Sequence, residues 1–290
     1  MNITRRKFLK TGALVAAAAP FSPMLTAASS NVYRSGNPDT RQSITWWVLA
    51  DPHVGYPGYR ENILTSVRDV NNLDVDYAIV IGDLFEDDRA FLGQLESEMN
   101  EFKHEWTYIL GNHDYDKNTG APVLPATYFT RKTAGIRIIA LSDEMLENHS
   151  HRTELGKNQD QWFRDVLNED PDIPTLVFTH HCPVTSHRSV SSFDDWLSNE
   201  MANYNIVLWI VDHAHRWKID KNIDSYGFDR IKVGSICEKY GDRRPCESAL
   251  LKIEDQGEYT RLNMRFRNHE DRRWLMADGY DNYELEVKTG

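Results

Sequence analysis

The sequence Ile44-Thr45-Trp46-Trp47-Val48-Leu49-Ala50-Asp51-Pro52-His53 contains the pattern from which the fold can be predicted. Its first seven residues are apolar or β-branched, a length and composition typical of a buried strand, and we expect Trp46 and Trp47 in the core. The apolar run ends at Asp51, and His53 follows two positions later. A carboxylate and an imidazole directly after a buried strand indicate a functional site at the carboxyl end of that strand.

Four more apolar runs further along the chain end in the same way. They are residues 78–81, 106–110, 175–179 and 206–211, which are followed by Gly82-Asp83, Gly111-Asn112-His113-Asp114, His180-His181 and Asp212-His213-Ala214-His215. In α/β sheets the loops after the strands converge, and ligands bind outside the carboxyl ends of the strands. We therefore expect all five polar clusters to face one crevice.

These clusters combine carboxylate, amide and imidazole groups and contain no thiolate. Such a set of hard oxygen and borderline nitrogen donors favours Zn, Mn or Fe over a soft metal. The donors are numerous enough for two ions that share one carboxylate. Two ions ~3.5–4 Å apart can stabilise both the attacking and the leaving oxygen of an in-line displacement at phosphorus. The sequence thus predicts a two-metal site suited to phosphate chemistry.

Between these strands, apolar residues recur at helical spacing, which predicts alternating strands and helices and hence an α/β fold. The predicted helices cover residues 63–70, 91–102, 161–167 and 193–204. A hairpin is expected from residues 128–133 and 136–141, which Ala134-Gly135 would join. The C-terminal part is rich in predicted strands, at residues 231–236, 248–253 and 258–266.

Composition excludes several protein classes. The 290 residues are 40% hydrophobic and 27% charged, with 16 Gly and 11 Pro, which argues against collagen-like, coiled-coil and low-complexity chains. The formal net charge of −11 makes nucleic acid an unlikely partner, because proteins that track phosphate backbones need a basic surface. Three cysteines are too few for a disulfide-stabilised module. Cys237 and Cys246 are candidates for a disulfide in an oxidising compartment, with a core position for Cys237 as the alternative.

The first 28 residues are predicted to be an export signal. Arg5 and Arg6 precede a short apolar stretch at residues 13–19, and the small residues at 25–28 suit signal peptidase. The paired arginines resemble a twin-arginine (Tat) signal, which implies the Tat machinery as a partner and a periplasmic or secreted protein. The apolar stretch ends at Pro20 and is far shorter than the ~20 residues that cross a bilayer. No transmembrane span is therefore expected in the mature chain.

The sequence thus divides into four predicted segments: a Tat-type signal peptide at 1–28, a linker at 29–43, one domain at 44–270 and a C-terminal tail at 271–290. The linker is inferred from a polar, aperiodic stretch with Gly, Pro, Asn and Ser. The domain contains all five polar clusters.

The five clusters, taken in order, resemble the signature blocks of calcineurin-like metallophosphoesterases. The matching residues are Asp51-x-His53, Gly82-Asp83-x-x-Glu86, Gly111-Asn112-His113-Asp114, His180 and His213-x-His215. The resemblance covers about residues 44 to 267 in the family's order. It implies a four-layer αββα sandwich, in which two sheets face each other between outer helices.

The resemblance also implies a role for each site residue. Two metal ions would be bound by Asp51, His53 and His215 on one side, by Asn112, His180 and His213 on the other, and by a bridging Asp83. Asp83 is thus expected to be essential for catalysis, and His113 to stand beside the leaving-group oxygen without binding metal. The implied reaction is hydrolysis of a small phosphomonoester or phosphodiester by direct attack of a metal-bridging hydroxide. Mn, Zn and Fe remain alternatives for the metal.

Three positions depart from the family pattern. Asp212 stands where the family usually has Gly before the His-x-His pair. A Cys follows His180-His181 where members often carry Pro, and His181 remains the second choice for the ligand at this block. Glu86 occupies the position at which purple acid phosphatases place a Tyr ligand. A tyrosinate-to-iron colour is therefore not expected.

Two other functions stay open: a catalytically silent metal-binding protein on the same fold, and a metallohydrolase that acts on a non-phosphorus ester. Four arginines are candidates for binding a substrate phosphate, with a solvated surface position as the alternative: Arg188, Arg216, Arg243 and Arg244. Five histidines lie outside the pattern and are expected at the surface: His104, His149, His151, His187 and His269.

Overall fold

The computed structural model describes residues 43–56, 61–116, 118–145, 153–181, 200–223, 226–237, 246–276 and 282–289. All of them belong to the compact unit Ser35–Gly290. The predicted signal peptide and nearly all of the predicted linker lie outside this set, as does most of the helix expected at residues 193–204. The described part of that segment contains a single 3-10 turn, η3 (Met201–Asn203). Within the ranges given, no helix has the length and apolar character needed to cross a membrane.

The first sheet has seven strands, with β1 near its centre. Its order is β14 (Arg273–Trp274), β13 (Tyr259–Asn268), β12 (Glu247–Asp255), β1 (Ser43–Leu49), β2 (Tyr77–Ile81) and β3 (Glu105–Ile109), and β15 (Tyr283–Lys288) also pairs with β13. β1, β2 and β3 run parallel to one another. Their carboxyl ends therefore lie at one edge of the sheet, where Asp51, Asp83 and Asn112 follow them.

The second sheet has six strands. Its order is β10 (Trp217–Asp220), β11 (Asp229–Val233), β9 (Ile206–Val211), β8 (Thr175–Phe178), β5 (Ile136–Ala140) and β4 (Phe129–Thr133). β5, β8 and β9 are parallel, which brings His180 and His213 to the same edge. β4 and β5 form the predicted hairpin, and β6 (Glu144–Met145) pairs separately with β7 (Thr153–Glu154).

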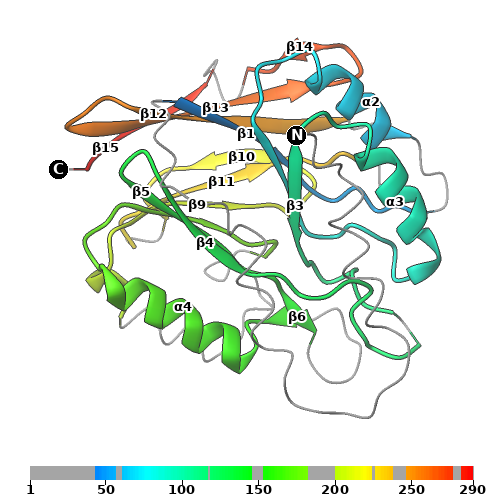
Figure 1. Cartoon of the computed structure of the whole chain (residues 1–290), viewed down its shortest axis with the longest axis horizontal. Helices are drawn as coiled ribbons and strands as arrows, with labels where there is room; N and C mark the ends of the chain where they lie inside the picture. The colour runs from blue at the N-terminus through cyan, green and yellow to red at the C-terminus, as the bar shows by residue number, and fades with distance from the viewer. Residues whose placement is uncertain are drawn as a thin grey trace, which may run out of the picture. The chain divides into compact units, whose positions relative to one another are not determined.

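Helices cover the outer face of each sheet (Figure 1). α2 (Asn62–Val70) and α3 (Leu92–Met99), which follows the 3-10 turn η2 (Arg89–Phe91), pack on the first sheet through one apolar cluster. α4 (Lys157–Glu169) packs on the second sheet through another. The predicted four-layer αββα arrangement is therefore confirmed.

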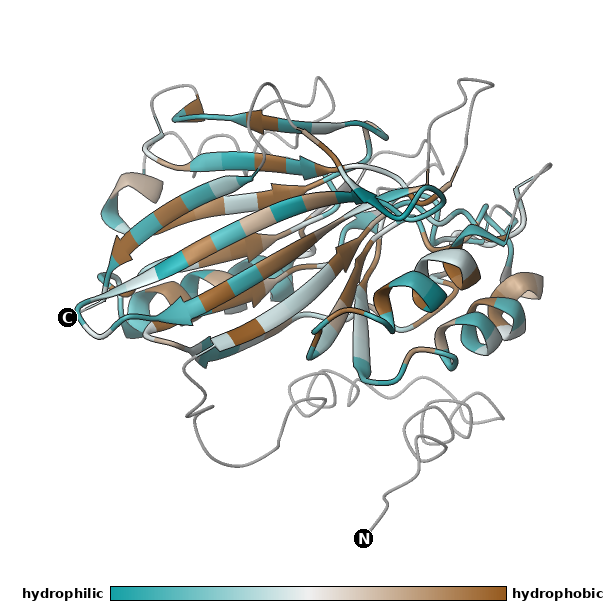
Figure 2. Ribbon diagram, turned by 90° about the horizontal axis from the view of Figure 1, so that it is seen from above, coloured by the Kyte–Doolittle hydropathy of each residue, from teal (hydrophilic) through white to brown (hydrophobic). Residues whose placement is uncertain are grey.

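Successive side chains of β1 point to opposite faces of the first sheet, and each face packs against a different layer. Trp47 belongs to the cluster beneath α2 and α3, whereas Trp46 points to the other face and stacks on Phe178 of β8, with 6.2 Å between ring centroids. Both tryptophans are fully buried, as predicted. Figure 2 shows the same alternation of hydrophobic and hydrophilic residues along the strands. Period-two patterning thus provides one apolar face for the helices and one for the opposite sheet.

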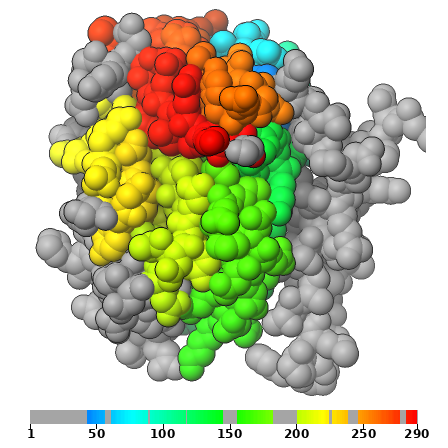
Figure 3. Space-filling view, turned by 90° about the vertical axis from the view of Figure 1, so that its left-hand side faces the viewer, coloured from blue at the N-terminus to red at the C-terminus, as the bar shows by residue number. Residues whose placement is uncertain are grey.

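The C-terminal residues, which we expected to form a tail, contribute two strands to the first sheet. β15 pairs with β13 along its whole length, and the Tyr283 hydroxyl donates a hydrogen bond to Asp229 of β11, at 2.9 Å. In Figure 3 these last strands, red and orange, lie beside the green and yellow strands of the second sheet. The end of the chain is therefore part of the packed domain.

His269 is buried, and the prediction of a surface position for it is wrong. Its Nδ1 lies 2.9 Å from Asp69 Oδ2 and its Nε2 lies 2.6 Å from Ser248 Oγ. Burial acts against ionisation of Asp69, but hydrogen bonds from Arg267 and His269 hold the pKa of this carboxyl below its usual range. An imidazole with two partners is well accommodated in a core. His104 is exposed, as expected, while residues 149, 151 and 187 lie outside the described residues.

Cys237 and Cys246 are both free thiols in the structure, so the candidate disulfide is not formed. Both side chains are buried, and Cys237 has the core position that was the alternative. Cys246 Sγ lies 2.9 Å from Ser66 Oγ of α2. Burial raises the pKa of the Cys246 thiol to about 12.

Candidate metal centre

The backbone at the strand ends has an unusual conformation. Five of the proposed ligands have positive φ angles: Asp51 (49°), His53 (43°), Asp83 (50°), His213 (73°) and His215 (53°). Residues with a Cβ adopt this left-handed region at a cost, and such strain is concentrated at functional sites. Hydrogen bonds between the loops stabilise it: the Asp51 amide donates to Gly82 O and the His53 amide to Asp83 O, at 3.1 and 3.0 Å.

Two glycines allow the loops to approach closely. A Cβ on Gly82 would lie 2.5 Å from the His180 ring. A Cβ on Gly111 would lie 2.5 Å from both the amide nitrogen and Oδ1 of Asp83. The glycines in the Gly-Asp and Gly-Asn-His-Asp blocks therefore provide the space in which Asp83 and His180 meet.

This packing leads to a prediction for Gly111→Ala. The added methyl group must displace Asp83 or His180, so we expect a loss of ~1–3 kcal/mol of stability and less bound metal. The matched control is Gly93→Ala on α3, where a Cβ has no neighbour within 4 Å; a helical Gly→Ala change is expected to stabilise by roughly 0.5–1 kcal/mol. Thermal unfolding and elemental analysis measure both effects. A Gly111→Ala protein with full metal and unchanged unfolding would contradict this account of the loop packing.

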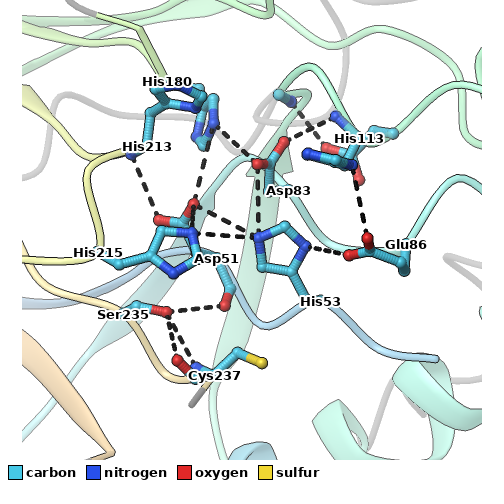
Figure 4. A network of polar contacts seen from close by, with 12 residues as sticks. Asp51, His53, Asp83, Glu86, His113, His180, His213, His215, Ser235 and Cys237 are labelled. Carbon is cyan, nitrogen blue, oxygen red and sulfur yellow. Dashed lines mark hydrogen bonds and ion pairs between the residues drawn. The ribbon is translucent and has the colours of Figure 1, made fainter. Parts of the chain in front are cut away.

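Asp51, His53 and His215 form the first ligand set, and Figure 4 shows them facing one point. Their ligand atoms all lie within 4.8 Å of one another. Asp51 Oδ1 is 3.2 Å from His215 Nε2, and the Nε2 atoms of His53 and His215 are 3.3 Å apart. All three side chains are buried. One carboxylate and two imidazoles with this spacing can bind one cation of the Zn, Mn or Fe type.

Asp83 lies between this set and the next. Its Oδ2 is 3.6 Å from His53 Nε2 and 3.2 Å from His180 Nε2. Its Oδ1 accepts a hydrogen bond from the His113 amide, at 2.8 Å, which fixes the orientation of the carboxylate (Figure 4). A single carboxylate oxygen thus faces ligands of both sets.

The second set is built around His180, Asn112 and His213. His180 Nδ1 is 2.9 Å from the carbonyl oxygen of Ile81, and this contact turns Nε2 toward Asp83. Asn112 Oδ1 and His213 Nδ1 are buried, and among the described residues neither atom has a hydrogen-bond partner. Leaving such atoms unsatisfied is costly, and a cation bound to both would remove that cost. The residues present therefore fit a second metal ion.

Burial and neighbouring charges shift the pKa values of the residues in the centre. Burial opposes ionisation of Asp51, but the charges of His215 and His180 lower its pKa to about 2. Burial likewise opposes ionisation of Asp83, and His180 nevertheless holds the pKa of Asp83 well below its usual range. Burial and the nearby His181 and His180 lower the pKa of His213 to about 3. The two carboxylates are therefore charged and His213 is neutral at pH 7. Burial opposes protonation of His180, but Asp83 and Asp51 raise the pKa of His180 well above its usual range, so His180 must release its proton when a cation binds.

Three carboxylates contact the site histidines. The sequence interpretation quoted Glu86 without giving it a role toward a histidine, and it missed Asp87 and Asp143. Glu86 Oε2 lies 2.8 Å from His53 Nδ1, Asp87 Oδ1 lies 3.0 Å from His113 Nδ1, and Asp143 Oδ2 contacts His181 Nδ1. Such partners fix the tautomer and ring orientation of histidines. A signal was present for Asp143, because it follows the apolar strand β5 just as the other site residues follow their strands.

The Gly-Asn-His-Asp loop is held by its last residue. Asp114 accepts hydrogen bonds from the amides of Gly111 and Phe85, at 2.7 and 3.1 Å. Burial and the proximity of Asp83 raise the pKa of Asp114 well above its usual range. The His113 ring stands edge-on to His53, with centroids 5.1 Å apart. The loop thus directs His113 toward the centre from one side.

Two further residues have defined positions. Asp212, which replaces the family's Gly, is buried at the end of β9, and its amide donates to the carbonyl oxygen of His180 at 3.2 Å. Burial and the charge of Asp51 raise the pKa of Asp212 well above its usual range. Arg216 is exposed beside His215. The other candidate phosphate-binding arginines, at positions 188, 243 and 244, lie outside the described residues.

Comparison with known proteins gives one family and several related folds. A family model described as calcineurin-like phosphoesterase matches residues 44–217. A bovine (Bos taurus) transmembrane protein with metallophosphoesterase domain is 24% identical over 198 residues, which is 60% of this chain and 42% of that protein. This chain therefore spans less than half the length of the bovine relative.

Two solved structures have a similar fold. A dimetal phosphatase from Danio rerio superposes with a TM-score of 0.59 at 13% identity, over 85% of this chain and 99% of that chain. A purple acid phosphatase from yellow lupin (Lupinus luteus) gives a TM-score of 0.59 at 14% identity, over 86% of this chain and 55% of that chain. At these identities the likeness concerns the fold alone.

Proposed function

Because the chain belongs to the calcineurin-like phosphoesterase family, we propose that it is a metal-dependent phosphoric ester hydrolase. Its substrate is a small phosphomonoester or phosphodiester. The observation that carries this proposal is the position of Asp83, whose Oδ2 faces His53 Nε2 and His180 Nε2 at 3.6 and 3.2 Å. A carboxylate placed in this way supports the sharing of one ligand between two cations.

The residues of this centre would have different roles: most would bind the cations, and His113 would act on the leaving group. One cation would be bound by Asp51, His53 and His215, and the other by Asn112, His180 and His213, with Asp83 common to both. Two bound cations polarise phosphoryl oxygens and increase the acidity of water. His113 is oriented by Asp87 through its Nδ1, at 3.0 Å, and would donate a hydrogen bond or a proton to the departing oxygen.

An assay on a panel of phosphate esters tests the proposal. The purified chain is incubated with Mn²⁺, Zn²⁺ or Fe²⁺ and then with aryl and alkyl monoesters and diesters of phosphate. We expect hydrolysis that a chelator abolishes and that added metal restores. Two bound metals without hydrolysis of any ester would instead support a catalytically silent metal-binding protein. Hydrolysis of carboxylic esters alone would support a non-phosphorus metallohydrolase.

We also propose that the protein is exported through the Tat machinery to the periplasm or beyond. Support comes from Arg5 and Arg6 before the short apolar stretch at residues 13–19. Replacing both arginines with Lys keeps the positive charge but removes the guanidinium pair, and we expect export to stop. Cell fractionation with immunodetection measures this, with a Lys7→Arg variant as the control. Double-variant protein that still reaches the periplasm would contradict Tat export.

A further inference from the structure

His181 lies next to a proposed ligand, and its place in the fold is defined by a carboxylate. Its Nδ1 contacts Asp143 Oδ2, and both side chains are largely buried. Asp143 itself is fixed by its backbone: its amide donates to the carbonyl oxygen of Leu110 at 2.9 Å, and its carbonyl oxygen accepts from the Tyr115 hydroxyl at 2.6 Å. The end of β5 is thereby tied to the loop that carries Asn112.

The His181 ring also faces the second ligand set. His180, His181 and His213 each offer a ring nitrogen, and these nitrogens lie within 4.8 Å of one another. The rings of His181 and His213 are 4.0 Å apart with a tilt of 39°, and the rings of His180 and His181 are 4.9 Å apart and nearly perpendicular. Three imidazoles thus surround one point, where two were predicted.

The contact with Asp143 decides which nitrogen of His181 has a lone pair. A carboxylate attracts the ring hydrogen to Nδ1, so that Nε2 is left as the donor atom for a cation. The order carboxylate, histidine, metal is a recurrent arrangement that orients the ligand and raises its basicity. The same logic applies to His180, whose Nδ1 faces the carbonyl oxygen of Ile81 at 2.9 Å.

We propose that His181 is a further ligand of the second cation, together with His180 and His213, and that Asp143 is the residue that positions it. This inference extends the metal centre on which the proposed function depends. It replaces the choice between His180 and His181 with a site that uses both. With Asn112 and Asp83 the second position then has five protein ligands, which exceeds the four of a typical tetrahedral zinc site. The second position is therefore expected to favour Mn or Fe.

Metal binding by three variants of the full chain tests this inference. Asp143→Ala should weaken binding of one of the two ions by ~10–100-fold, the usual effect of losing a partner of a metal-bound histidine. His181→Ala removes the ligand itself and should weaken binding of the same ion at least as much. Asp87→Ala is the matched control, because it removes the carboxylate from His113, which is not a proposed ligand. The affinity of both ions should be unchanged in that control. Competition with a chromogenic chelator gives the two affinities for Mn²⁺ and Zn²⁺ without any assay of hydrolysis.

A spectroscopic measurement supplements the affinities and covers the case in which a variant is unstable. In the Co²⁺-loaded protein, the Nδ1 hydrogen of a coordinated His181 should give a hyperfine-shifted, exchangeable proton signal in the NMR spectrum. This signal should be absent from His181→Ala and altered in Asp143→Asn. Full two-ion affinity together with an unchanged set of shifted signals in His181→Ala would overturn the inference.

The two proposals fail in different ways. A protein that binds two ions through His181 but hydrolyses no phosphate ester would refute the proposed function and leave the ligand assignment intact. A protein that hydrolyses phosphate esters with unchanged metal affinity in His181→Ala would refute the ligand assignment alone. Failure of the wild-type chain to bind any ion would refute both.

Discussion

Asp83→Asn is expected to abolish hydrolysis and to lower the amount of bound metal. The asparagine has nearly the same shape as the aspartate and can still accept the hydrogen bond from the His113 amide, which spans 2.8 Å. The change therefore removes one negative charge from the oxygen that faces both ligand sets. Loss of an outer partner of a metal ligand typically costs ~10–100-fold in activity, and we expect the loss of a shared ligand to exceed that range.

The matched control is Asp74→Asn, which makes the same chemical change at an exposed position before β2. Elemental analysis after gel filtration gives the metal content, and turnover of an aryl phosphate gives the activity. We expect Asp74→Asn to match the wild type in both measurements. Full occupancy by two metals and unchanged turnover in Asp83→Asn would exclude a bridging role for Asp83.

His113→Ala is expected to reduce the rate of hydrolysis to different extents for two kinds of substrate. His113 follows Asn112, and its ring is directed to Asp87 and lies beside His53, so both metals should be retained. General-acid help at a leaving group contributes about 10²–10⁴ in rate. An alkoxide is a poor leaving group and needs that help, whereas a nitrophenolate leaves readily without it. The variant should thus lose much more activity on an alkyl phosphate than on a nitrophenyl phosphate.

Rates on the two substrates and a metal analysis of the same preparation check this prediction. Asp87→Asn provides a graded comparison, since it keeps a hydrogen-bond partner for His113 Nδ1 but removes the charge. Equal losses on both substrates would mean that His113 stabilises the phosphoryl oxygens instead. Loss of metal from His113→Ala would place His113 among the ligands.

Much of the fold could be predicted because apolar runs that form strands are followed closely by polar residues such as Asp, Asn or His. No packing requirement explains the polar residues Asp51, Asp83 and Asn112 after three of these runs. The three strands are parallel, so the structure brings these residues to one edge of the sheet. The histidines after β8 and β9 meet them from the opposite sheet, as the four-layer arrangement requires. Local pattern and tertiary structure agree at these positions.

The remaining features depend on contacts that one segment of sequence does not encode. His269 can be buried because Asp69, 200 residues away in the chain, and Ser248 provide partners for its two ring nitrogens. The sequence places Glu86 and Asp143 shortly after strands, but it does not indicate which histidine of another loop each of them contacts. β15 has a weakly apolar sequence, and its pairing with β13 gives it a place in the sheet. These positions are decided by partners distant in sequence, which periodicity cannot reveal.

The central place of β1 has a consequence for how the chain can fold during its synthesis. Trp47 pairs with Ala78 of β2 on one side but with Leu250 of β12 on the other. The segment at 44–217 that matches the family includes every proposed ligand, yet on its own it would leave β1 as an edge strand with unpaired amides and carbonyls. Closing so long a loop is also slow, because contacts between distant residues limit folding rates. The stretch of chain that contains the proposed ligands is therefore shorter than the stretch that completes the sheet around β1, which includes β12.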